Sequence, residues 1–251
     1  MIGKNLLRCA VVALTTLAPA QQVSETSAFP CPEKLSFRVE WHGIMAGMAT
    51  VSLVRPKPDQ WQTTLDVESA GMVNRLYHVL DKYKVLMNGK FCGVASELNA
   101  EEGKHNKYEK LSFDPSQRKV SYYERDIVKN QETRKEVDAS TCEYEITGAL
   151  LTLRSLNLEP GKSIMLPMTD GKKAANVRIE AQGKEKMTYE GKTYPTIRYE
   201  AFVFDNVLYK RKGRLLMWIT DDSARLPVAL RMQMGFPIGA VNVELQKQDK
   251  A

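Results

Sequence analysis

The chain has 251 residues, of which 43% are apolar and 26% are charged, and these ordinary proportions exclude a disordered, collagen-like or multi-span membrane protein. Its 36 basic and 30 acidic residues give a net charge of +6, a mild excess that favours loose attraction to anionic surfaces and does not indicate a nucleic-acid partner. A chain of this length buries enough apolar surface to fold without depending on a metal or disulfides.

Residues 1–20 have the three-part pattern of a secretory signal peptide. Two basic residues come first, an apolar run over residues 9–17 follows, and Ala18-Pro19-Ala20 supplies the small residues that signal peptidase recognises. The run is too short to span a bilayer, and the mature chain has no transmembrane segment. We therefore predict cleavage after Ala20 and a soluble, exported chain, periplasmic or extracellular; a buried first helix is the alternative.

The first half of the mature chain shows mostly strand patterns. Residues 21–32 are polar with two prolines and predict a flexible lead-in, and residues 33–251 are expected to form a single β-rich domain. A turn bounded by Gly43 and Gly47 separates the first two strand patterns and predicts a hairpin. Strand patterns recur over residues 35–41, 49–53, 61–67, 92–98, 108–113 and 120–124.

Two segments show helical spacing. Met72, Leu76 and Tyr83 belong to an apolar series with a period near 3.6 residues, which predicts a helix over about residues 72–83. A second helix is expected over about residues 142–156, because Ser140 and Glu143 have capping-box spacing before an apolar stripe. The charged stretch between residues 125 and 138 is expected to be a solvated loop or strand end.

The second half returns to strands, and together the patterns indicate a mainly β, or β-rich α+β, fold. Alternation recurs over residues 177–181, 197–203, 228–234 and 241–245. Residues 215–219 are apolar throughout, so both faces of that strand need cover, and we expect a helix on the second face. We predict a single strongly curved antiparallel sheet, or half-open barrel, with about two helices packed on its concave side; two small domains are the alternative.

Three cysteines remain after signal cleavage, which is an odd number for an oxidising compartment. Cys92 lies in an expected strand and Cys142 at an expected helix start, so we predict a disulfide between them. Pairing of Cys31 with either one, or three buried thiols, stays open. No Cys-x-x-Cys occurs and the histidines lack ligand spacing, so no metal site is predicted.

No motif indicates catalysis or a cofactor. A nucleophile elbow, a phosphate-binding glycine loop, a dinucleotide fingerprint and His-Glu-x-x-His are all absent from the sequence. Asp221 and Asp222 form the most suggestive acidic pair, but their place before Pro227 favours turn chemistry with Arg225. The run Tyr209-Lys210-Arg211-Lys212 is expected to be a solvated hairpin end, although it suits an anionic lipid headgroup.

The expected strands offer more apolar surface than two helices can cover, which predicts an apolar groove. One wall is expected to contain Leu216, Trp218, Leu230, Met232, Val243 and Leu245. The facing wall is expected to contain Met72, Leu76 and Leu80. Methionines would let this groove adapt to the shape of a ligand. The alternative is that side chains fill the space completely, as in small closed barrels.

Three motifs follow in order along nearly the whole mature chain. They are the Trp41 strand with Gly43 and Gly47, the helix 149–156 with a glycine after it, and a Trp strand that runs into Thr-Asp-Asp and Arg-x-Pro, with Asp221, Asp222, Arg225 and Pro227. Their order and spacing resemble an exported bacterial family catalogued as domain of unknown function 3108. The resemblance implies an exported β-rich domain similar in shape to curved-sheet lipoprotein carriers, and implies no activity.

These patterns lead to three hypotheses for function. The first is a non-enzymatic cell-envelope protein that binds an apolar ligand, such as a lipid or acyl chain, in the groove. The second is an envelope-integrity or assembly factor that binds another protein. The third is a secreted hydrolase that uses Asp221, Asp222 and His42 or His78, and the absence of a nucleophile motif counts against it.

Overall fold

The computed structural model describes residues 30–235 and 239–250. The predicted signal peptide and its cleavage site lie outside the described residues.

The first meander of strands comprises β1 (Glu33–Trp41), β2 (Ile44–Lys57), β3 (Gln60–Ser69), β4 (Val79–Asn88), β5 (Gly93–Glu102), β6 (His105–Asp114), β7 (Lys119–Asp126) and β8 (Gln131–Asp138). The second comprises β9 (Ser163–Thr169), β10 (Ala174–Tyr189), β11 (Lys192–Ala201), β12 (Gly213–Thr220), β13 (Pro227–Met234) and β14 (Ala240–Lys250). The two helices are α1 (Gly71–Leu76) and α2 (Ile146–Ser155).

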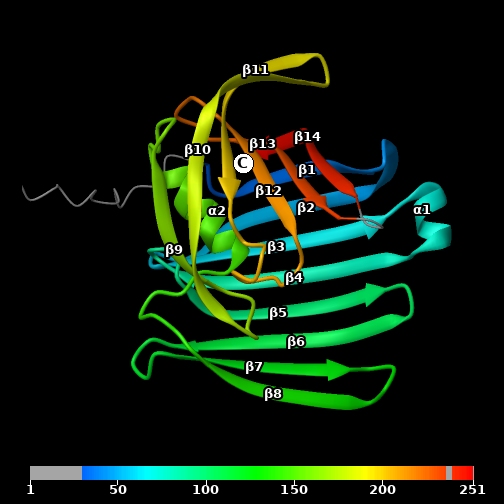
Figure 1. Ribbon diagram of the computed structural model, residues 1–251, viewed down its shortest axis with the longest axis vertical. Helices are drawn as coiled ribbons and strands as arrows, with labels where there is room; N and C mark the ends of the chain where they lie inside the picture. The colour runs from blue at the N-terminus through cyan, green and yellow to red at the C-terminus, as the bar shows by residue number, and fades with distance from the viewer. Residues whose placement is uncertain (1–29, 236–238, 251) are drawn as a thin grey trace, which may run out of the picture.

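All these strands form one antiparallel sheet, as the alternating patterns predicted (Figure 1). Its order is β8-β7-β6-β5-β4-β3-β2-β1-β14-β13-β12-β11-β10-β9, so every pairing joins two strands that are consecutive in the chain except the pairing of β1 with β14. In that pairing Phe37 lies opposite Leu245. The two outer strands, β8 and β9, are consecutive in the chain, and the segment between them carries α2.

The sheet is so strongly curved that its two halves face one another. Figure 1 shows β9 to β12 crossing in front of the first meander, with α2 on the concave side. The turn between β9 and β10 reaches the first meander at Gly171, where a Cβ atom would lie 3.0 Å from the side chain of Leu111 in β6. In the same turn, Lys172 forms a 2.8 Å ion pair with Glu124 of β7. These contacts shape a half-open barrel around α2.

The largest core cluster joins α2 to the second meander. Ala149 and Leu153 of the helix pack with Ile179, Ala201 and Met217, which come from three successive strands of the sheet. These strand positions share one face because side chains along a strand alternate in direction. The apolar stripe of α2 therefore explains why the helix lies inside the barrel.

The first predicted helix is much shorter in the structure. Only Gly71–Leu76 is helical, and the chain enters β4 at Val79. The end of that apolar series also fits a strand, since Val79 and Tyr83 share one face of β4 with Val85 and Met87, which follow the series. Pairing of β4 with β3 and β5 satisfies its backbone groups on both sides and outweighs the local helical spacing.

Three further expectations change in detail. The second helix begins at Ile146 rather than near residue 142, and the predicted Ser140–Glu143 contact is present before it, with the Ser140 amide 2.8 Å from Glu143 Oε2. The charged stretch between residues 125 and 138 contains all of β8, an exposed edge strand. One face of β12 is covered by α2, as expected, and the other by the β10–β11 hairpin, where Trp218 donates to Glu185 Oε1 at 2.8 Å.

Candidate functional site

A cavity of about 360 Å³ lies inside the half-open barrel, between the two meanders and α2. Its lining is almost entirely aliphatic, with few polar side chains. The apolar lining residues of β1 to β3 are Leu35, Phe37, Val39, Ala49, Val51, Leu53, Leu65 and Val67. Those of α2 and the second meander include Ile146, Ala149, Leu150, Leu153, Met168, Ile179, Ala201, Leu215, Met217, Leu230, Val241 and Val243. The predicted apolar groove is therefore present as a cavity.

The cavity is closed at one end and open at the other. On β1, Leu35 is buried, whereas Val39 at the far end of the strand is only half-buried. On β3, Thr63 is buried, whereas Leu65 and Val67 are half-buried. Val241, at the start of β14, lies beside Trp41 at this same open end and is also half-buried. We call this open end, marked by Val39, Val67 and Val241, the mouth.

A buried ion pair forms the closed end. The guanidinium of Arg154 donates to both carboxylate oxygens of Glu33, at 2.7 and 3.2 Å, and both side chains are at most 3% exposed. Arg154 Nε also donates to the Arg225 carbonyl oxygen at 2.9 Å. Gln248 donates a further 2.8 Å hydrogen bond to Glu33. Because these charged groups satisfy one another, the closed end offers an incoming ligand mainly apolar contacts.

The closing motif of the sequence builds the turn beneath this ion pair. Asp222 Oδ1 accepts hydrogen bonds from Thr220 Oγ1 at 2.7 Å and from the Arg225 amide at 3.2 Å. This turn holds Arg225 at a φ of 46° and aims its guanidinium at the Tyr199 hydroxyl, 2.6 Å away. The turn therefore presents the Arg225 carbonyl to Arg154, and Pro227 just beyond it lines the cavity.

The residues of the hydrolase hypothesis lie apart. Asp221 forms a 2.8 Å ion pair with Lys184, and Asp222 is occupied by its turn. His42 lies in the β1–β2 turn and His78 lies between α1 and β4, at the ends of strands remote from the β12–β13 turn. The structure does not bring these four side chains together.

The glycines of the opening motif serve the β1–β2 hairpin. Gly43 has a φ of 75° in its turn, a conformation that glycine adopts without steric cost. At Gly47, a side chain would collide with the backbone of Glu68 on the neighbouring strand β3. Both positions therefore shape the mouth end of β1 and β2 rather than contact a ligand.

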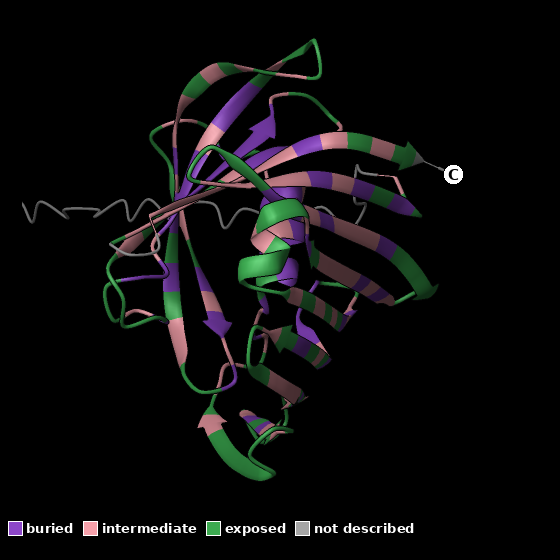
Figure 2. Ribbon diagram, turned by 90° about the vertical axis from the view of Figure 1, so that its right-hand side faces the viewer, coloured by how far each residue is buried: buried purple, intermediate pink, exposed green. Residues whose placement is uncertain are grey.

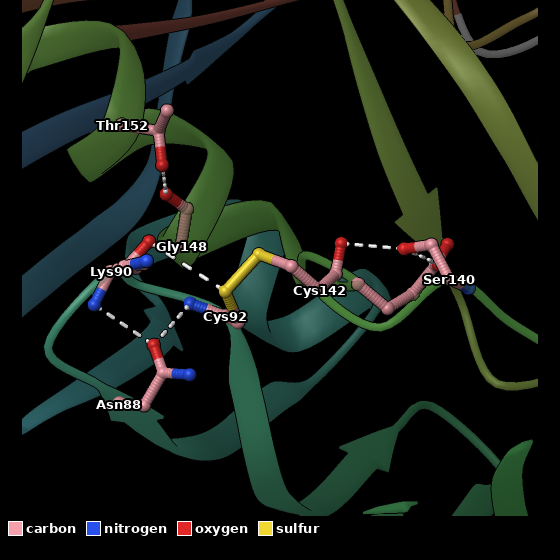
Figure 3. Close-up of a disulfide and its surroundings, with 8 residues drawn as sticks. Asn88, Lys90, Cys92, Ser140, Cys142, Gly148 and Thr152 are labelled. Carbon is pink, nitrogen blue, oxygen red and sulfur yellow. Dashed lines mark hydrogen bonds between the residues drawn. A yellow bond between two sulfur atoms is a disulfide. The ribbon is translucent and has the colours of Figure 1, made fainter. Parts of the chain in front are cut away.

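A disulfide joins Cys92 to Cys142, the pairing predicted from the sequence, with the two Cα atoms 5.0 Å apart (Figure 3). Cys31 is exposed and free. Nearby, Asn88 Oδ1 accepts hydrogen bonds from the Lys90 and Cys92 amides at 2.9 and 3.1 Å. The bridge thus ties the β4–β5 turn to the segment that leads into α2. It fixes the start of the helix that forms one wall of the cavity.

A buried carboxyl group stands at the beginning of α2. Glu145 accepts hydrogen bonds from the Tyr83 hydroxyl of β4 and from Ser96 Oγ of β5, the latter at 2.8 Å. Burial raises the pKa of Glu145 to about 7, against the lowering effect of these two donors. The charges of Asp170 and Glu109 raise it further. Burial and the Glu145 carboxylate also raise the pKa of Tyr83.

Only some of the residues predicted for the first wall line the cavity. Leu230 and Val243 line it. Met232 follows Leu230 on the same face and packs against the main core, and Leu245 is buried beside Phe37 without lining the cavity. The prediction was wrong for Leu216 and Trp218, which lie on the opposite face of β12 from the lining residues Leu215 and Met217. In a strand that is apolar at every position, alternation alone does not tell which face is inside.

The second predicted wall was wrong. Met72 and Leu76 are 64% and 76% exposed on α1, and Leu80 is 46% exposed on β4. None of the three lines the cavity. They were assigned to it because a long amphipathic helix was expected to lie across the sheet, and that helix is a single short turn followed by a strand. The facing wall comes instead from β1, β2, β3 and α2.

Sequence reasoning missed the polar elements of the site. Glu33, Arg154 and Glu145 were not singled out, and neither was the 2.9 Å hydrogen bond from Thr63 Oγ1 to Thr147 Oγ1 that joins β3 to α2 in the cavity wall. One signal was available for Arg154, since a basic residue interrupts the apolar run of the second helix. No local pattern connects it to Glu33, which lies far away in the sequence.

The described residues contain no helix long and apolar enough to cross a membrane. Within the same residues, no group of three or more histidine, cysteine, aspartate or glutamate side chains gathers in a way that would hold a metal ion.

The fold and cavity define a class of protein, a half-open β-barrel with an apolar lumen and one helix inside it. The chain belongs to the family described as Protein of unknown function (DUF3108), which matches residues 36–246. This is the family that the three sequence motifs resemble. No curated protein matches the chain.

One solved structure supports the barrel-like architecture. A beta-barrel-like protein of domain of unknown function DUF1849 from Brucella abortus has a TM-score of 0.60 at 8% identity, covering 88% of this chain and 98% of its own. Hypothetical protein CT021 from Chlamydia trachomatis has a TM-score of 0.38 at 6% identity, covering 91% of each chain. At 8% identity, the similarity to the DUF1849 protein describes the fold alone. The TM-score of the CT021 protein is too low to support a conclusion about the fold.

Proposed function

We propose that this protein is an exported, non-enzymatic carrier that holds a single acyl chain, or an apolar molecule of similar size, in its cavity. The observation that carries the proposal is the aliphatic cavity of about 360 Å³, in which lining residues such as Val51, Leu65 and Val243 are only half-buried. An apolar ligand would complete the burial of these side chains, at about 0.8 kcal/mol for each methylene group removed from water.

The size of the cavity favours one chain over a bulkier lipid. At about 30 Å³ for each water-sized group, a volume of about 360 Å³ accommodates roughly a dozen such groups. The ion pair between Arg154 and Glu33 closes the inner end and is already satisfied. A ligand with one apolar tail would therefore enter tail first and leave its polar end at the mouth.

Export is part of the proposal and rests on two observations. The first twenty residues have the order of a secretory signal. The Cys92–Cys142 disulfide is typical of proteins that fold in an oxidising compartment such as a bacterial periplasm. Export would place the cavity in the cell envelope, where acyl chains are the most abundant apolar molecules.

The test is a titration of the delipidated protein with a fluorescent fatty acid whose emission depends on its environment. Wild-type protein should bind it saturably. Val51→Trp should weaken binding by about tenfold or more, because the indole would occupy space that at least two methylene groups need. Val54→Trp is the matched control, since Val54 is an exposed residue on the same strand and does not line the cavity.

Two results would contradict the proposal. One is the absence of saturable binding by folded wild-type protein. The other is equal binding by wild-type protein and Val51→Trp when circular dichroism shows that the variant is folded. Mass spectrometry of material that co-purifies from the native envelope separates the competing hypothesis, because a bound polypeptide in place of a lipid would favour the assembly factor.

A further inference from the structure

We propose that α2 is a fixed end-stop inside the cavity, so that the carrier selects its ligand by the length of the apolar chain. The inference rests on the proposed function, because it specifies the ligand that the cavity holds. The helix crosses β1, β2 and β3 at the closed end of the cavity, where it leaves no further space for a chain.

The floor of the cavity is a row of three side chains on neighbouring strands, which we call the floor row. Glu33 of β1 pairs with Leu53 of β2, and Leu53 pairs with Thr63 of β3, so the three lie side by side in the lining. Each is at most 3% exposed. In the next row toward the mouth, Val51 and Leu65 are only half-buried. The space that a ligand can fill therefore ends at the floor row.

One face of α2 covers every member of the floor row. The side chains of this face are spaced four and three residues apart along the helix, and they are Thr147, Leu151 and Arg154. Thr63 donates a 2.9 Å hydrogen bond to Thr147, and Leu53 and Leu151 pack in the same buried core cluster. Arg154 donates to Glu33 at 2.7 Å. The helix is thus matched to the three strands in chemistry as well as in position.

The helix is fixed at this place from both ends. A Cβ atom on Gly148 would lie 2.5 Å from the Phe91 carbonyl oxygen, so the first turn of α2 rests against the β4–β5 turn. The Cys92–Cys142 disulfide ties the preceding segment to the same turn, and the Arg154 ion pair holds the last turn. Figure 2 shows α2 as a buried helix inside the curve of the sheet, behind the exposed α1. A helix held in this way acts as a stop and not as a lid that moves aside.

The depth and the volume of the cavity indicate the same chain length. From Leu35, just above the floor row, to Val39 at the mouth, β1 rises by about 13 Å at about 3.3 Å for each residue. Carbon–carbon bonds of about 1.5 Å in a zigzag advance an alkyl chain by about 1.3 Å for each carbon, so this depth takes roughly ten carbons. The volume of about 360 Å³ takes roughly a dozen. The expected ligand is therefore a straight chain of roughly ten to twelve carbons.

The experiment is displacement of the fluorescent fatty acid by unlabelled straight-chain fatty acids of increasing length, each below the concentration at which it forms micelles. Affinity for wild-type protein should rise about fourfold with each added methylene group, because each one is buried in the lumen. The rise should level off at roughly ten to twelve carbons, because additional methylene groups stay outside the mouth.

Variants at the floor row test the end-stop directly. Leu53→Ala removes the isopropyl group beyond Cβ and should move the levelling-off point to chains about two or three carbons longer. Leu151→Ala truncates the helix side of the same floor and should give the same shift, so it serves as a second test if the first variant does not fold. The matched control is Leu111→Ala, which truncates a leucine that is 4% exposed in a separate core cluster on β6. This control should keep the wild-type chain-length profile.

The outcomes separate the end-stop from the carrier proposal. Affinity that keeps rising through the longest chains would overturn the end-stop and leave the carrier proposal intact. Folded Leu53→Ala and Leu151→Ala proteins that level off where Leu111→Ala does would also overturn it. Absence of saturable binding at every chain length would instead contradict the carrier proposal itself.

Discussion

The buried carboxyl group of Glu145 makes a quantitative prediction about stability and pH. The pKa of this group is raised from 4.5 to about 7 by burial at the start of α2. In the unfolded chain it releases its proton near pH 4.5, whereas in the folded chain it retains the proton until about pH 7. Between these pH values the folded state binds the extra proton, so raising the pH favours unfolding.

The size of the pKa shift of Glu145 determines how much the free energy of unfolding changes with pH. At about 1.4 kcal/mol for each pKa unit, ionised Glu145 lowers the free energy of unfolding by about 3 kcal/mol once the pH exceeds 7. Glutamine resembles the protonated acid in size and keeps an oxygen that accepts a hydrogen bond from Ser96 or Tyr83. Glu145→Gln should therefore differ from wild-type protein by less than about 1 kcal/mol near pH 5 and exceed its stability by up to about 3 kcal/mol at pH 8.

The assay is urea denaturation of both proteins at several pH values between 5 and 8, with the free energy of unfolding extrapolated to water. Asp81, whose pKa burial raises to about 6, gives both proteins a slope of the same sign, so the difference between the two curves isolates Glu145. Parallel curves over this range would refute the reasoning, because they would show that the carboxyl group at the start of α2 has the same proton affinity in both states.

Three further predictions address stability and processing. Replacing Cys92 and Cys142 together by alanine should lower the free energy of unfolding by about 4 kcal/mol, as expected for loss of a bridge that closes a loop of 50 residues, and chemical denaturation measures the loss. Arg154→Met should cost about 3–5 kcal/mol because it leaves the Glu33 carboxylate buried without its partner, whereas Arg154→Met with Glu33→Met should cost less; equal losses would contradict the pairing argument. N-terminal sequencing of exported protein should begin directly after Ala20, and recovery of an intact Met1 terminus would refute the signal peptide.

The sheet was predictable from the sequence because alternation is a local property of each strand. Leu35, Phe37 and Val39 alternate with polar residues, and the structure places all three on the cavity side of β1. Two long-range features were not accessible in this way. The pairing of β1 with β14 depends on how the two meanders come together in space. The ion pair between Glu33 and Arg154 depends on the same long-range contact.

The candidate site was predictable in kind and only partly in its residues. A shortage of helical cover correctly indicated an apolar groove, because the amount of apolar surface can be read from composition and periodicity. To name the residues of its walls, one must know which face of an all-apolar strand points inward. Trp218 was assigned to the cavity, but it lies on the other face of β12 and donates a hydrogen bond to Glu185. Naming the walls also requires knowing whether a short apolar series is a helix or a strand. Leu80 was assigned to the cavity as part of a helix, but it lies on β4 and is exposed.

The single pairing between the first and last strands sets the order in which this molecule can become functional. Every other strand pairs with a neighbour in the chain, so each meander can assemble from local hairpins at little entropic cost. The lumen, however, takes one wall from each meander, and neither half encloses it alone. A chain that emerges N-terminus first therefore has no second wall until β14 is released. In the proposed carrier role, an unfinished chain has no enclosed cavity for a ligand, because it presents only a curved open sheet.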